Sequence, residues 1–177
     1  MGQAEILKVN MADIQPNLSS VTRISDLDLP EPSNAVLLKA LQEASKYLSY
    51  YKWVSRIDEQ FLGYAAEGII YIFLFKILPN RVDVDSWIWV IVGDVPPAYI
   101  TCEDAKTPAE ALDGYIGAME EWVETALRGK SVSRMIPVNV PATPENAELL
   151  RKRLEFLNKE ILAPLWRYTP RSPGGVH

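Results

Sequence analysis

The chain has 177 residues, 48% of them hydrophobic and 23% charged, with a formal net charge of -5. This length and composition fit one globular domain and exclude a fibrous or wholly disordered chain. A single cysteine, Cys102, permits no intramolecular disulfide, so we expect a cytoplasmic protein. The first residues lack the basic start and apolar run of a signal peptide, and the run Ile69–Phe75 is too short to span a bilayer. We therefore expect no membrane role.

The chain divides into an arm, one domain and a tail. Residues 1–32 carry three prolines and no sustained period, and we interpret them as an arm that docks in part on the body or forms a short strand. We expect a single domain over residues 33–166 and a loose tail over residues 167–177. In the domain, Ser33 is the predicted cap of a helix whose apolar positions from Val36 to Leu48 recur three and four residues apart.

Apolar runs predict the strands. A short strand, Phe61–Ala65, leads through a turn at Gly68 into Ile69–Leu78, and Trp87–Val92 follows after a loop. In the last run, Trp87, Trp89 and Ile91 alternate with Ile88, Val90 and Val92, so both faces must be covered. The two long runs are expected to pair antiparallel at the sheet centre, covered by this chain or, on one face, by a second copy as a homodimer.

Two helices have clear starts. Thr107, Pro108 and Glu110 form a capping box with proline at the first position, and this helix runs to Leu127. Gly114 and Gly117 inside it predict a close backbone approach to the sheet or another helix. After an expected edge strand within 134–140, Thr143 starts a last helix that Pro164 is expected to end. The predicted fold class is α+β, with a central, mainly antiparallel sheet of about four strands packed with three amphipathic helices.

Charge is unevenly distributed along the second half of the chain. Residues 103–124 contain seven acids and one base, whereas residues 128–171 contain nine bases and four acids. Two interpretations stay open: the acidic and basic helices complement each other within the fold, or they form a charged docking surface. Nucleic-acid binding through Arg151, Lys152 and Arg153 is not expected, because the chain is acidic and this helix lacks interleaved aromatic residues.

Several enzyme mechanisms have no residues to support them. The one histidine, His177, is the last residue and cannot readily serve a serine or cysteine nucleophile, or a zinc site. The sequence contains no dinucleotide, P-loop or hydrolase-elbow motif. Cys102 has the acidic neighbours Glu103 and Asp104, which favour a packed thiol over a nucleophile. We assign no catalytic residue, metal ligand or cofactor.

Carboxylates offer one alternative function. Asp94 follows the central strand, and Glu103 and Asp104 precede the capped helix. With Asp83 or Asp85 they are candidates for a magnesium or calcium site, or an acid/base pair, in a divalent-metal-dependent enzyme. The competing interpretation is that these acids serve turns and helix caps.

The run WIWVIVGDVPPAYITCEDAKTPAEALDGYIGAMEEWVE, from Trp87 to Glu124, resembles small bacterial α+β proteins of unknown function. In these, an aromatic strand, a Gly-Asp turn, a short strand and a Pro-capped acidic helix follow one another. The resemblance implies a bacterial, cytoplasmic protein of the immunity type and carries over no catalytic residue. We therefore expect a non-enzymatic binding protein whose acidic helix meets a basic protein partner. The candidate binding residues are Asp94, Tyr99, Glu103, Asp104, Glu110, Asp113, Glu120, Glu121 and Glu124.

Overall fold

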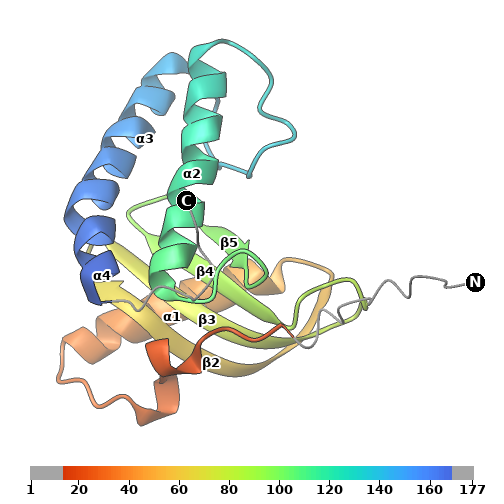
Figure 1. The fold of residues 1–177 in the computed structure, drawn as a ribbon, viewed down its shortest axis with the longest axis vertical. Coiled ribbons are helices and arrows are strands. Elements are labelled where there is room, and N and C mark those ends of the chain that lie inside the picture. Colours follow the sequence, from red (N-terminus) through yellow and green to blue (C-terminus); the bar gives the residue numbers. More distant parts are fainter. Residues whose placement is uncertain (1–13, 169–177) are drawn as a thin grey trace, which may run out of the picture.

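A five-stranded antiparallel sheet in the order β1-β2-β3-β4-β5 organises the protein (Figure 1). The computed structural model describes residues 14–168. The predicted α+β class is confirmed, with one strand more than expected. The strands are β1 (Thr22–Arg23), β2 (Val54–Ala66), β3 (Ile70–Pro79), β4 (Trp87–Gly93) and β5 (Ala98–Thr101).

The arm supplies the additional strand. Between two 3₁₀ turns, η2 (Leu18–Ser20) and η3 (Ile24–Asp26), β1 pairs with Leu62 and Phe61 of β2. β1 lies within residues 1–32, the segment expected to form an arm, and residues 1–13 lie outside the described part. The tail beyond Tyr168 lies outside it too.

β2 is more than twice as long as the strand expected over Phe61–Ala65. Its pairing with β3 shifts register three times, between Val54 and Arg56, between Ile57 and Glu59, and between Leu62 and Tyr64. Each shift moves the alternation of side chains by one residue, so the period of two disappears from the sequence. β2 and β3 form the predicted hairpin, with Gly68 at φ 77° in its turn.

Two apolar cores cover the two faces of β3 and β4, which pair antiparallel near the middle of the sheet. Trp87, Trp89 and Ile91 belong to the core on one side, and Ile88, Val90 and Val92 to the core on the other. This is the predicted alternation. Both cores are completed by this chain's own helices, so neither face needs a second copy to cover it.

The face of Ile88 and Val90 is covered by α1 (Ser33–Ser49), which buries Leu37, Ala44 and Leu48. Ser33 is not the cap, contrary to prediction. The carboxylate of Glu31 accepts the backbone N–H of Ala35 at 3.2 Å, while the Ser33 hydroxyl donates to Glu67. An acidic side chain at a helix N-terminus satisfies a free donor and also favours the helix dipole.

The opposite face is covered by α2 (Pro108–Leu127), beside which lie α3 (Pro144–Phe156), a π-helical segment η4 (Leu157–Leu162) and α4 (Ala163–Tyr168). Figure 1 shows α2 and α3 side by side, rising past the sheet. Within residues 14–168, no helix combines the length and apolar character needed to cross a membrane.

Three details of this helical layer correct the predictions. Gly114 and Gly117 do not allow a close approach: a Cβ at Gly114 would lie 3.6 Å from Ile100, and one at Gly117 would meet nothing within 4 Å. The connector 128–143 contains no strand. Pro164 does not end the last helix, because the π turn before it, in which Ala163 N–H donates to Asn158, shifts the hydrogen-bond register that a proline would otherwise break.

Candidate functional site

The acidic helix α2 begins as its sequence indicates. The Thr107 hydroxyl accepts the backbone N–H of Glu110 at 3.2 Å, and the Glu110 carboxylate accepts the backbone N–H of Lys106 at 2.7 Å. Of the acidic binding candidates on this helix, Glu110 is therefore partly used in capping. The others are exposed, namely Asp113, Glu120, Glu121 and Glu124.

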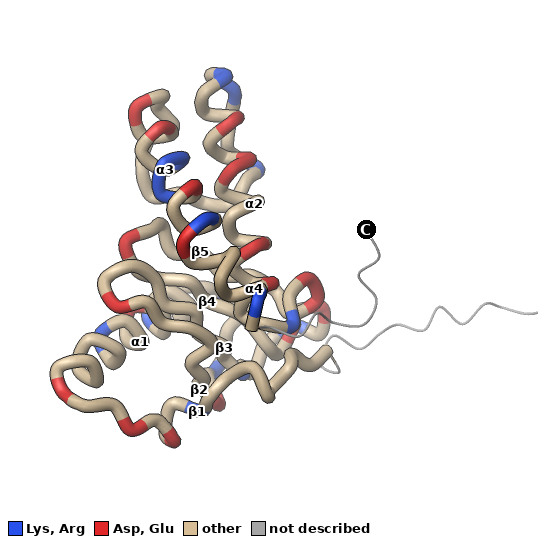
Figure 2. The backbone as a smooth tube through the Cα atoms, turned by 60° about the vertical axis from the view of Figure 1, so that its left-hand side comes forward, with Lys and Arg blue, Asp and Glu red and all other residues tan. Residues whose placement is uncertain are grey.

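These four exposed acids, here called the acidic face, lie close together on the helix surface. Asp113, Glu120 and Glu124 are spaced by seven and four residues, which places them on one stripe of a helix, and Glu121 lies beside it. Helix α2 contains no lysine or arginine (Figure 2). No ion pair joins the acidic face to any cation within residues 14–168.

The two arginines of α3, Arg151 and Arg153, are engaged elsewhere. The Arg151 guanidinium donates to Glu148 and Glu155 of its own helix, at 2.6 Å to each, and lowers the pKa of the Glu148 carboxyl. Arg153 lies 3.4 Å from Asp94, in the turn after β4. Although α2 and α3 pack together, no salt bridge in the described part supports the interpretation that their charges complement each other.

The metal-site candidates are separated by the pairing of β4 with β5. Ile91 pairs with Ala98 and Ile88 with Thr101, so Asp94 lies at one end of the pair while Glu103 and Asp104 follow its other end. Strands rise by about 3.4 Å per residue, which keeps the two groups more than about 10 Å apart. Asp104 accepts the Thr101 hydroxyl at 3.3 Å, as expected for an acid serving a turn.

Of the two further candidates for this cluster, Asp83 is exposed and pairs with Arg81, while Asp85 is buried. Across residues 14–168, nowhere do three or more His, Cys, Asp or Glu side chains come together as a metal would require. The metal-dependent alternative thus has no cluster of carboxylates in this part of the chain.

Tyr99 lies apart from the acidic face, on the side of the sheet covered by α1. Its ring contacts Tyr51 and Trp53 edge-on, with centroids 5.2 and 5.4 Å apart. The Tyr47 and Tyr51 hydroxyls lie 2.9 Å from each other. Burial raises the pKa of Tyr99. These rings form an aromatic cluster near the C-terminus of α1.

Two hollows next to this cluster were missed by sequence reasoning. The larger, of about 580 Å³, lies between α1 and the turn after β4, and the smaller, of about 300 Å³, continues along α1 toward its N-terminus. Both are lined by Glu43 and Gly93. One feature of the sequence points to these hollows. On α1, apolar and charged residues three and four apart flank the stripe of buried residues. The other wall of the hollows is formed by residues of the β2–β3 hairpin, the turn after β4 and the connector before α3. These segments lie far from α1 in the sequence, and periodicity cannot bring them together.

A third hollow, of about 480 Å³, lies between η3 and β2. Its charged groups are already paired: Arg23 binds Glu59, which Lys76 also approaches at 3.9 Å, and Arg56 binds Asp58. This hollow therefore presents no charge that lacks a partner.

Comparisons of the chain with family models, with curated proteins and with solved structures gave no match.

Proposed function

We propose that the protein is a non-enzymatic binding protein of the immunity type, whose acidic face on α2 docks on a basic surface of a protein partner. The observation that carries this proposal is that Asp113, Glu120, Glu121 and Glu124 are exposed together and pair with no cation among residues 14–168. The immunity type is what the resemblance of residues 87–124 to small bacterial α+β proteins of unknown function would imply. Such a role would place the protein in the cytoplasm, where the free thiol of Cys102 is stable.

The like charges of the acidic face destabilise α2 when no partner is bound. Like charges three or four residues apart, as in Glu120 with Glu124, repel each other and weaken a helix. No base on α2 offsets that repulsion. A partner that supplies lysines or arginines would relieve it on binding, and the field of the acidic face would speed the encounter.

Charge reversal tests the proposal. The full chain and its variant with Glu120, Glu121 and Glu124 changed to lysine serve as baits in the native host, and the captured protein is purified and titrated against both. We expect the partner to be basic and to bind the variant at least about tenfold more weakly. The association rate with the unchanged chain should fall steeply as salt is added.

A matched control carries the same change of charge at other exposed acids, Asp26, Asp28 and Glu160. It should bind the partner as the unchanged chain does. Capture of the same proteins by the α2 variant, with unchanged affinity, would overturn the proposal. Equal weakening by the control would assign the effect to net charge and would also overturn it.

A further inference from the structure

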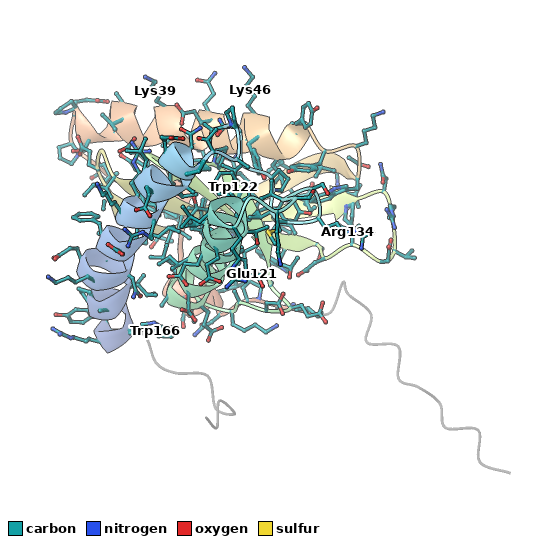
Figure 3. All side chains as sticks on the ribbon, turned by 90° about the horizontal axis from the view of Figure 1, so that it is seen from above. Lys39, Lys46, Glu121, Trp122, Arg134 and Trp166 are labelled. Atoms are coloured by element: carbon teal, nitrogen blue, oxygen red, sulfur yellow. The ribbon has the colours of Figure 1, made fainter. Side chains whose placement is uncertain are left out.

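We draw no further inference here: the strongest candidate, the two hollows beside α1, carries none, because Glu43 and Asp94 line them as well as Lys39 and Lys46, which extend from the outer side of this helix (Figure 3), and nothing in the described structure shows what covers them.

Discussion

The carboxylate of Asp85 accepts the backbone N–H of Cys102 at 3.0 Å, and its other oxygen accepts the backbone N–H of Trp87 at the same distance. Asp85 is only 2% exposed. It therefore ties the loop before β4 to the end of β5, where the chain turns toward α2. Without these two bonds, the peptide groups at Trp87 and Cys102 would lose their acceptors inside the protein.

Replacing Asp85 with asparagine should destabilise the fold by about 1–3 kcal/mol, because an amide offers one acceptor oxygen where the carboxylate offers two. The difference in unfolding free energy between the unchanged chain and Asp85→Asn should shrink as pH rises. Burial raises the pKa of Asp85 above its usual value of 3.8, so the unfolded chain releases this proton at lower pH than the folded protein. The Asp85 contribution to folding stability is thus complete below about pH 3.8 and declines as pH rises through the raised pKa.

Urea unfolding of both proteins between about pH 4 and pH 7 measures this trend. The gap in unfolding free energy between the unchanged chain and Asp85→Asn should be widest at the acidic end. The control Asp83→Asn, at an exposed acid whose pKa Arg81 lowers, should show no such narrowing. A gap that is constant over this range would refute the role assigned to burial.

Two glycines should respond in opposite directions to alanine. At Gly63 a Cβ would lie 2.9 Å from Pro108 Cγ, 3.0 Å from Trp89 and 3.1 Å from the Ile72 carbonyl oxygen, so Gly63→Ala should cost about 1–3 kcal/mol by overpacking. At Gly117 the space is open, and Gly117→Ala should stabilise by about 1 kcal/mol through helix propensity. Thermal unfolding distinguishes the two signs, and a destabilising Gly117→Ala would contradict the structure.

Much of the fold could be predicted because its signals are local. Alternation identified β4 and the burial of both its faces, and the Thr107 cap located the start of α2. The length of β2 could not be predicted, because three register shifts within one strand depend on its pairing with β3. Strand β1 has two residues and exists through its contact with Phe61 and Leu62. No periodicity can develop over so short a segment.

The candidate surfaces likewise combine features that local sequence signals predict with features that only the fold produces. Exposure of the acids on α2 follows from helical spacing, and this was predicted. Helical spacing already brings Arg151 beside Glu148 and Glu155, which are three and four residues away on the same helix. The contact of Arg153 with Asp94, in contrast, depends on how α3 lies against the turn after β4. The larger hollow beside α1 is lined by Tyr47 together with Val95 and Pro97 from the turn after β4, and only the fold brings these residues together.

Neutralising one acid of α2 should raise or lower stability according to its role. Glu124→Gln should raise Tm, because it removes repulsion from Glu120 that no described cation offsets. About 1 M salt should remove most of this gain by screening. Glu110→Gln should lower Tm, because the Glu110 carboxylate accepts the N–H of Lys106 at 2.7 Å. Calorimetry at low and high salt measures both, and a salt-independent gain at Glu124 would argue against electrostatic repulsion.

The Cys102 thiol should be unreactive until the protein opens. Burial, with a smaller contribution from the Asp85 carboxylate, raises the pKa of this thiol far above its ordinary range, and its side chain is fully buried. Since the thiolate is the reactive form, a thiol reagent at pH 8 should label native protein roughly 100-fold or more slowly than protein in denaturant. Asp85→Asn should accelerate native labelling, because the Cys102 backbone then loses its anchor. Native labelling as fast as that of the unfolded chain would show that the end of β5 is open to solvent.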